Sequence, residues 1–167
     1  QMSGGMRQRI VGAIAISCAP RLLIADEPTT SLDLTIQAQY LNLLRDLQRQ
    51  HRLALIFITH NLGIVAKMCD QVAVMYAGRL VEWGPVTRIF DSPAHPYTRA
   101  LLESIPRMGD SRDRLTAIEG QPPDLAGLPP GCALHPPCPP AIAPRRLVAP
   151  PETALGPSHT ARCWLNV

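Results

Sequence analysis

Two acidic residues, Asp26 and Glu27, directly follow an apolar segment at residues 22–25, and His60 directly follows a second one at residues 53–59. Adjacent carboxylates can hold a divalent cation or act as a general base, and an imidazole can move a proton or contact an anion. Paired acids are costly unless a cation or a nucleophile uses them. The alternative is that an acid only caps the next turn and that His60 is a hydrogen-bonded structural residue.

The elements around these residues must bring them together. Continuous apolar runs favour strands at 21–26 and 53–59 that are covered on both faces, as in parallel α/β sheets. A polar loop is expected at 29–33 and an amphipathic helix at 34–50, with Asp33 as its N-cap. Because one helix of crossover length joins the strands, they should run parallel, with their carboxyl ends at one edge of the sheet. Ligands of such sheets bind beyond that edge.

The segment Ser3-Gly4-Gly5 precedes a predicted helix at residues 6–19 that ends before Pro20. Its apolar residues predict a helix that is amphipathic to buried. Ser3 is a candidate N-cap, and a glycine turn at a helix N-terminus can also present N–H groups to an anion. Later in the chain we expect a helix at 62–69, a hairpin of strands 71–76 and 79–84 that turns at Gly78, and helices at 85–90 and 95–105.

Composition limits the class of protein. With 46% hydrophobic and 17% charged residues, the chain of 167 residues is not wholly disordered. Its small net charge of +3 does not indicate a surface that binds nucleic acid. No apolar run reaches the roughly 18 residues of a membrane span. Thirteen of the 18 prolines lie at or after Pro106, which argues against long helices or central strands there. We therefore predict domains at 1–105 and 106–167.

Four motifs in this order resemble the second half of the ATP-binding subunit of an ABC transporter. They are Met2-Ser-Gly-Gly-Met6, the strand that ends at Asp26-Glu27, Ser31-Leu-Asp33, and Thr59-His60. Further segments resemble the oligopeptide/dipeptide (and nickel) importer branch of that family: Met75–Glu82, His95–Leu102, Gln121–Leu125 and Gly131-Cys132. The resemblance covers nearly the whole chain.

The resemblance implies a role for each matching residue. Ser3, Gly4, Gly5 and Met6 would form the signature motif that closes over ATP on the opposite subunit, with Met6 where the superfamily commonly has Gln. Asp26 would hold Mg²⁺ through water, Glu27 would be the general base, and His60 would contact the γ-phosphate. Ser31 and Asp33 would form the loop that couples the two nucleotide sites. Asn61 stands where Asp is common, and we expect little consequence from that change.

One expected motif is missing. The sequence contains no Gly-x-x-x-x-Gly-Lys-Ser/Thr phosphate loop, and no Gln-containing loop precedes the signature segment. Since the chain opens inside a glycine turn, it looks like the later part of a longer protein. We predict that this chain alone neither binds ATP tightly nor hydrolyses it. We also predict poor solubility, because apolar faces and strand edges would be exposed.

The later part of the chain contains Cys132, Cys138 and Cys163, whereas Cys18 and Cys69 read as small core residues. In some members of the importer branch, the Cys-rich tail resembles a four-cysteine iron–sulfur site. The three cysteines match three of its positions, and Arg145 or Arg146 falls near the fourth. The spacing Cys132-x-x-His135-x-x-Cys138 could instead hold zinc, or no metal binds.

The resulting expectation is a partial P-loop NTPase domain of the ABC type, an α/β fold with a largely parallel sheet, followed by an irregular Pro- and Cys-rich tail. It would use ATP and Mg²⁺ to drive peptide import at the cytoplasmic face of the bacterial inner membrane. Its partners would be a second ATP-binding subunit, two transmembrane permease subunits and, indirectly, a solute-binding protein. The alternatives are a soluble ABC-type ATPase without a transport role, or a non-catalytic remnant with a metal-binding tail. The choice between peptide and nickel stays open.

Overall fold

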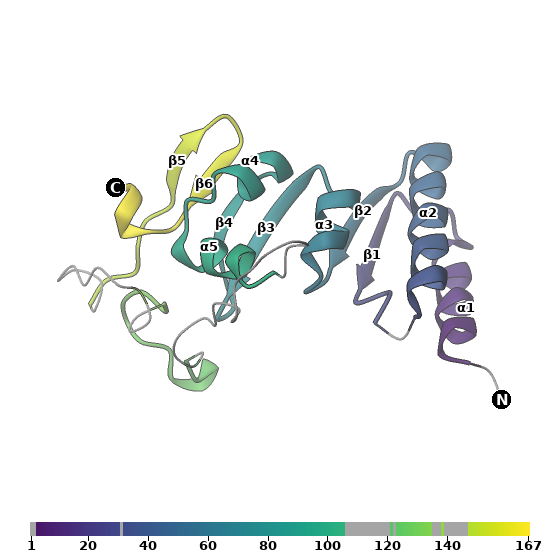
Figure 1. The fold of residues 1–167 in the computed structure, drawn as a ribbon, viewed down its shortest axis with the longest axis horizontal. Helices are drawn as coiled ribbons and strands as arrows, with labels where there is room; N and C mark the ends of the chain where they lie inside the picture. The colour runs from purple at the N-terminus through teal and green to yellow at the C-terminus, as the bar shows by residue number, and fades with distance from the viewer. Residues whose placement is uncertain (1–2, 31, 106–120, 122, 135–137, 139–146) are drawn as a thin grey trace, which may run out of the picture. The chain divides into compact units, whose positions relative to one another are not determined.

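The computed structural model describes the whole chain except residues 1–2, 31, 106–120, 122, 135–137 and 139–146 (Figure 1). It divides into two compact units, residues 1–69 and residues 70–167. The domain boundary predicted near residue 106 falls outside the described residues and stays a prediction.

The first unit contains a β-α-β crossover (Figure 1). Its elements are α1 (Gly4–Ile16), β1 (Leu22–Asp26), α2 (Leu34–His51), β2 (Ala54–Ile58) and α3 (Leu62–Met68). Strands β1 and β2 pair in parallel, in a register that runs from Leu22 opposite Ala54 to Asp26 opposite Ile58. The predicted parallel pair is confirmed, and its carboxyl ends lie at one edge.

Short polar side chains begin all three helices of this unit. The Ser3 hydroxyl accepts a hydrogen bond from Met6 N at 3.3 Å, and Asp33 Oδ1 accepts one from Ile36 N at 2.9 Å. Asn61 Oδ1 accepts from the backbone of the first turn of α3 in the same way. These contacts satisfy N–H groups that have no partner inside the helix. The predicted caps Ser3 and Asp33 are therefore confirmed.

Helix α1 packs against α2 through a glycine. A Cβ atom on Gly12 would lie 2.8 Å from the hydroxyl oxygen of Tyr40, a distance that real Cβ contacts do not show. The absence of a side chain at Gly12 therefore allows the two helices to approach closely. Tyr40, Leu41 and Leu44 are the buried residues of α2.

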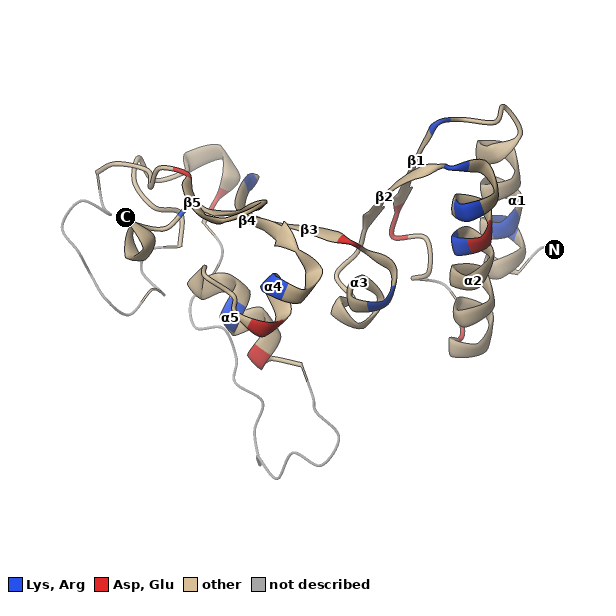
Figure 2. Ribbon diagram, turned by 90° about the horizontal axis from the view of Figure 1, so that it is seen from above, with Lys and Arg blue, Asp and Glu red and all other residues tan. Residues whose placement is uncertain are grey.

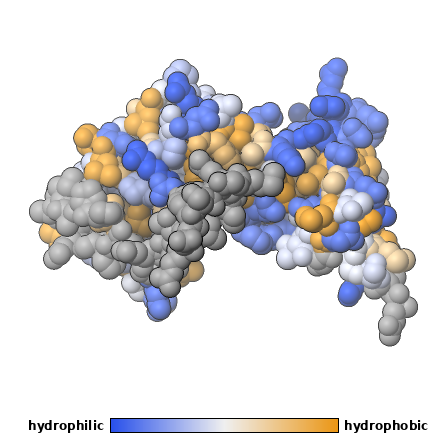
Figure 3. Space-filling model, viewed as in Figure 1, coloured by the Kyte–Doolittle hydropathy of each residue, from blue (hydrophilic) through white to orange (hydrophobic). Residues whose placement is uncertain are grey.

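The other apolar side chains of α1 are not covered. The helix buries no residue, Ile14 is 66% exposed, and Cys18 just beyond the helix is exposed as well. The prediction of an amphipathic to buried helix is thus wrong for this chain, as is the assignment of Cys18 to the core. The reason is that no described element of the first unit covers this face, and apolar side chains reach its surface (Figure 3).

The second unit is built on an antiparallel sheet. Strands β3 (Gln71–Tyr76) and β4 (Arg79–Pro85) form the predicted hairpin, and both of its turn residues, Ala77 and Gly78, have positive φ, as a tight two-residue turn requires. Helices α4 (Val86–Asp91) and α5 (Pro96–Glu103) follow. The sheet order is β3-β4-β6-β5, with β5 at Thr153–Gly156 and β6 at His159–Ala161. The described residues thus show one parallel pair and one antiparallel sheet, and they do not show a largely parallel sheet.

Strand β6 corrects the expectation of an irregular tail without central strands. It lies between β4 and β5 in the sheet. Proline excludes sheet pairing only where a proline stands, and residues 158–167 contain none. Two short 3-10 helices, Leu125–Gly127 and Trp164–Asn166, complete the described tail.

A buried carboxylate links the elements of the second unit. Glu82 on β4 accepts hydrogen bonds from Ala94 N at 2.8 Å, His95 N at 3.0 Å and His159 Nε2 at 2.9 Å. Burial raises the pKa of Glu82, but the Thr98 hydroxyl, the two amides and His159 together lower it by more. The carboxylate therefore ties β4 to the start of α5 and to β6.

His95, the N-cap of α5, is almost fully buried. Its Nδ1 accepts a hydrogen bond from Tyr97 N at 3.1 Å. Burial lowers the pKa of His95 from 6.5 to about 4, although the nearby Glu82 carboxylate and the backbone of Arg162 act in the opposite direction. His95 is therefore neutral at physiological pH. Within the described residues, no helix combines the length and the apolarity needed to cross a bilayer.

Candidate functional site

Glu27 and His60 meet at the carboxyl edge of the parallel pair. Glu27 comes directly after β1, and its backbone N–H donates to the carbonyl oxygen of Ile58 at the end of β2, at 2.9 Å. Glu27 Oε1 accepts from the backbone N–H of His60 at 3.1 Å, and its distance to His60 Nδ1 is 2.7 Å. The predicted proximity of the acid and the imidazole is therefore confirmed.

The backbone of Glu27 has an unusual conformation. Its φ of 43° lies in the left-handed region, which a residue with a Cβ adopts only at a cost of about 1–3 kcal/mol. The hydrogen bond from its N–H to Ile58 O and the two contacts with His60 hold it there. Strained residues of this kind concentrate at functional sites, which favours a chemical role over a simple turn.

The second carboxylate oxygen of Glu27 also has a partner. The Thr30 hydroxyl donates a hydrogen bond to Oε2 at 2.8 Å. The Thr30 hydroxyl and, after it, the His60 side chain hold the pKa of Glu27 below its ordinary value. Glu27 is therefore a carboxylate at neutral pH, as a general base must be.

The contact with Glu27 selects a tautomer of His60. An ionised carboxylate only accepts hydrogen bonds, so His60 Nδ1 must carry the hydrogen. The neutral ring then has a bare Nε2. A hydrogen bond from Nε2 to an anion would need a second hydrogen, which only the protonated imidazole has. The His60 side chain is 80% exposed, so an incoming ligand can reach it.

The remaining predicted residues lie on the same unit. Asp26 is exposed, ends β1 and stands beside Glu27, where Figure 2 shows acidic residues at the end of the strand. Ser3, Gly4 and Gly5 form the start of α1, and Met6 is the residue whose N–H the Ser3 side chain accepts. Asp33 caps α2. Ser31 lies outside the described residues.

The predicted cysteine ligands all lie in the second unit. Cys132 and Cys138 are half-buried and Cys163 is buried, but no three metal-binding side chains come together anywhere in the described part of the chain. His135, which stands between the two cysteines of the possible zinc motif, is not among the described residues. The hypotheses of an iron–sulfur cluster and of a zinc site at these cysteines therefore stay predictions.

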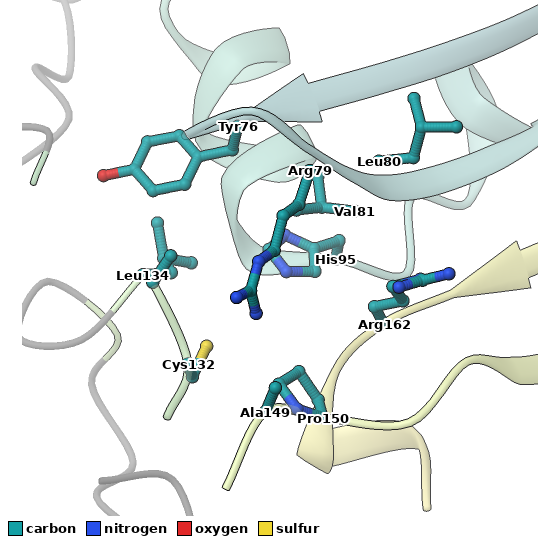
Figure 4. A pocket seen from close by; sticks show the side chains of 11 residues that line it. Tyr76, Arg79, Leu80, Val81, His95, Cys132, Leu134, Ala149, Pro150 and Arg162 are labelled. Atoms are coloured by element: carbon teal, nitrogen blue, oxygen red, sulfur yellow. The ribbon is translucent and has the colours of Figure 1, made fainter. Parts of the chain in front are cut away.

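Cys132 instead lines a small cavity of about 40 Å³ in the second unit, together with Arg79 and His95 (Figure 4). A volume of this size holds a few water molecules at most. The cavity is therefore too small for a nucleotide.

Sequence reasoning missed three residues with clear contacts. The sequence places Thr30 in a polar loop without a role, and it does not indicate that Glu82 and His159 pair. Glu82 carried a signal, because a charged residue inside an apolar hairpin needs a partner when it is buried. The partner itself, His159, lies 77 residues away, and no local pattern indicates it.

Comparison with known proteins identifies the family of the chain. Residues 1–30 match the family described as "ABC transporter", and residues 81–144 match "Oligopeptide/dipeptide transporter, C-terminal region". The chain is 52% identical over 166 residues to the dipeptide transport ATP-binding protein DppD of Bacillus subtilis, covering 99% of this chain and 50% of that protein. It is 48% identical over 167 residues to the oligopeptide transport ATP-binding protein OppD of Salmonella typhimurium, covering 100% of this chain and 50% of that protein.

Among solved structures, a putative metal-chelate type ABC transporter in an inward-facing conformation is 33% identical, with a TM-score of 0.49 over 53% of this chain and 35% of that one. A likeness of this size adds nothing to what the sequence matches show. Residues 1–30, which include α1, β1 and Glu27, are part of an α/β domain of the ABC type, and β1 pairs in parallel with β2, the strand that precedes His60. The chain belongs to the ATP-binding subunits of ABC transporters of the oligopeptide/dipeptide branch. It spans about half the length of the curated relatives it matches.

Proposed function

We propose that this chain carries the residues for ATP hydrolysis, at one edge of the sheet, in an ATP-binding subunit that drives peptide import. The observation that carries the proposal is the contact of Glu27 with both the backbone and the ring of His60 at the carboxyl edge of β1 and β2. In open α/β sheets, ligands bind beyond this edge. The two relatives named above are called dipeptide and oligopeptide transport proteins, which supports a peptide as the substrate.

In this proposal Glu27 is the general base that accepts a proton from the attacking water. Its lowered pKa keeps it ionised, and its backbone is held rigidly by Ile58. His60 orients Glu27 through Nδ1 and directs Nε2 outward. A protonated His60 would donate from Nε2 to a phosphate oxygen while keeping its contact with Glu27.

The start of α1 would bind phosphate in the opposite subunit. The Ser3 oxygen accepts from Met6 N, which leaves its own O–H able to donate to a phosphate oxygen. The cap role and the ligand role are therefore compatible. The N–H groups of Gly4 and Gly5 and the positive end of the helix dipole favour an anion at the same place. Asp33 uses one carboxylate oxygen as a cap, and we propose that Ser31 and Asp33 couple the two nucleotide sites.

The exposed carboxylate of Asp26 fits a Mg²⁺ ion held through water, because Mg²⁺ prefers oxygen ligands and keeps several waters. When bound, MgATP supplies the phosphoryl group that is transferred to water. The phosphate loop that neutralises the β- and γ-phosphates does not occur in these residues. We therefore expect this chain by itself neither to bind ATP tightly nor to hydrolyse it.

The likeness to this family supports a proposal for the rest of the assembly. We propose residues 1–105 as the later half of the nucleotide-binding domain and residues 106–167 as the importer-type tail. The partners would be a second ATP-binding subunit, two transmembrane permease subunits and, indirectly, a solute-binding protein. The subunit would act at the cytoplasmic face of the bacterial inner membrane.

The test replaces Glu27 by Gln in the full-length subunit assembled with its partners. Gln keeps the shape and can still accept a hydrogen bond, but it cannot take a proton. We expect ATP binding to be unchanged and turnover to fall by about 10²- to 10⁴-fold, the usual contribution of general base catalysis. Undiminished hydrolysis by Glu27→Gln would remove Glu27 from the role of base.

A further inference from the structure

The two oxygens of the Glu27 carboxylate have different surroundings. Oε1 faces two hydrogen-bond donors of His60, the backbone N–H at 3.1 Å and Nδ1 at 2.7 Å. Among the described residues, Oε2 faces one donor, the Thr30 hydroxyl at 2.8 Å. A carboxylate oxygen accepts about two hydrogen bonds. His60 thus saturates Oε1, while Oε2 keeps one accepting position.

We propose that Thr30 is a positioning residue for hydrolysis, which holds Glu27 Oε2 in place and leaves its remaining lone pair directed at the attacking water. The inference rests on the proposed role of Glu27 as the base. Thr30 itself does not exchange a proton with water in this scheme. It acts by anchoring the second oxygen of the carboxylate, in addition to the contacts by which His60 holds Oε1.

The backbone around Thr30 supports this role. Thr30 stands three residues after Glu27 in a tight turn, in which Thr30 N donates to Glu27 O at 3.4 Å and Leu32 N donates to Thr29 O at 3.1 Å. The same turn leads directly to Asp33, the cap of α2. Thr30 therefore holds the base from the loop that precedes the helix joining β1 to β2.

The magnitude of the effect follows from geometry. A misplacement of a catalytic group by about 1 Å can cost about 10²-fold in rate. Since His60 still holds Oε1 when Thr30 is altered, the loss should be smaller than this, about tenfold in kcat. Binding of ATP should not change, because Thr30 touches the base and not the nucleotide in this arrangement.

The experiment compares Thr30→Val, which has the same shape without the hydroxyl, with Thr30→Ser, which keeps the hydroxyl, in the full-length subunit assembled with its partners. We expect Thr30→Val to lower kcat about tenfold with an unchanged KM for ATP, and Thr30→Ser to stay within about twofold of the parent. Thr87→Val, at an exposed position of α4, is the matched control. A kcat for Thr30→Val within twofold of the parent would overturn the proposal, as would an equal loss in Thr30→Ser.

A double variant separates this proposal from the one on which it rests. In the Glu27→Gln background, Thr30→Val should cause no further loss, because it acts only through the carboxylate. If Glu27→Gln hydrolyses ATP normally, the role of the base is wrong. If Glu27→Gln is inactive and Thr30→Val alone is fully active, only the role of Thr30 is wrong. A further loss in the double variant also contradicts an effect through Glu27.

Discussion

His159 Nε2 lies 2.9 Å from Glu82 Oε1, and both side chains are buried, although 77 residues separate them in the chain. This contact attaches the last strand of the sheet to the β3–β4 hairpin. Gly84 makes room for it, because a Cβ atom there would lie 2.9 Å from Cδ2 of the His159 ring. The closing segment of the chain is thus held to the second unit by a charged group inside the core as well as by strand pairing.

Removing the Glu82 carboxylate should destabilise the second unit. Glu82→Ala leaves His159 and two amides without an acceptor, and we expect a loss of about 3–5 kcal/mol in the free energy of unfolding. Glu82→Gln keeps one oxygen and should lose less, about 2 kcal/mol. Urea titration followed by tryptophan fluorescence measures both, since Trp83 and Trp164 lie in this unit. Equal stability of Glu82→Ala and the parent would contradict the role of the carboxylate as a link.

Acid should destabilise the second unit at pH values well above those at which ordinary carboxylates become protonated. The folded chain keeps His95 neutral down to about pH 4, whereas the unfolded chain protonates it near pH 6.5. The unfolded state therefore binds more protons between these values, and stability falls as pH falls through that window, by about 3 kcal/mol in all. Glu82, whose folded pKa is lowered, adds to the loss below about pH 4.5.

The pH dependence can be assigned to His95 with one variant. His95→Asn keeps an oxygen that can cap α5 but removes the titrating ring. We expect it to be less stable than the parent at pH 7 and to have a flatter stability profile between pH 6.5 and 4. The measurement is the urea midpoint at several pH values. An unchanged slope in His95→Asn would show that another group causes the loss.

A double-mutant cycle tests the contact between α1 and α2. Gly12→Ala alone places a methyl group against the Tyr40 hydroxyl and should cost about 1–3 kcal/mol. In a Tyr40→Phe background the hydroxyl is gone and the nearest ring atoms are 3.6 and 3.7 Å away, an ordinary contact. There Gly12→Ala should stabilise by up to about 1 kcal/mol, from helix propensity. Thermal unfolding of the four proteins gives the coupling, and additive effects would mean that the hydroxyl does not limit this contact.

The cap of α2 can be separated from the proposed coupling role of Asp33. Asp33→Ala removes the acceptor for Ile36 N and should cost about 1 kcal/mol of stability, whereas Asp33→Asn keeps a cap and should be nearly neutral. If Asp33 also couples nucleotide sites, Asp33→Asn in the full-length subunit should lower turnover without lowering stability. Equal stability of the Ala and Asn variants, measured by urea unfolding, would rule out the cap as a contributor.

The uncovered face of α1 should make the chain associate. Val11 and Ile14 are 64% and 66% exposed, and contiguous apolar surface of this kind promotes association. Replacing both by Lys should raise solubility and lower the association state seen by sedimentation velocity. Leu125→Lys, at a similarly exposed single position in the second unit, should change little. A parent chain that is monomeric and soluble at high concentration would contradict this prediction.

Local chemistry allowed the sequence to predict much of the first unit. Apolar runs, the caps Ser3 and Asp33 and the crossover length determine two parallel strands, and parallel strands place Glu27 and His60 at one edge. The sequence also predicts the hairpin turn at Ala77-Gly78, because the backbone conformation of this turn depends on two adjacent residues.

Contacts between residues that are distant in sequence, or that stand in segments without a clear sequence pattern, depend on the tertiary structure. The pairing of Glu82 with His159, the insertion of β6 beside β4 and the burial of His95 depend on how segments with no shared local signal pack together. The hydrogen bond from Thr30 to Glu27 joins residues close in sequence, but it occurs together with a positive φ at Glu27 and with contacts from Glu27 to Ile58 and His60, which lie more than 30 residues away. Propensity describes single segments, and these features arise from the free energy of joining several.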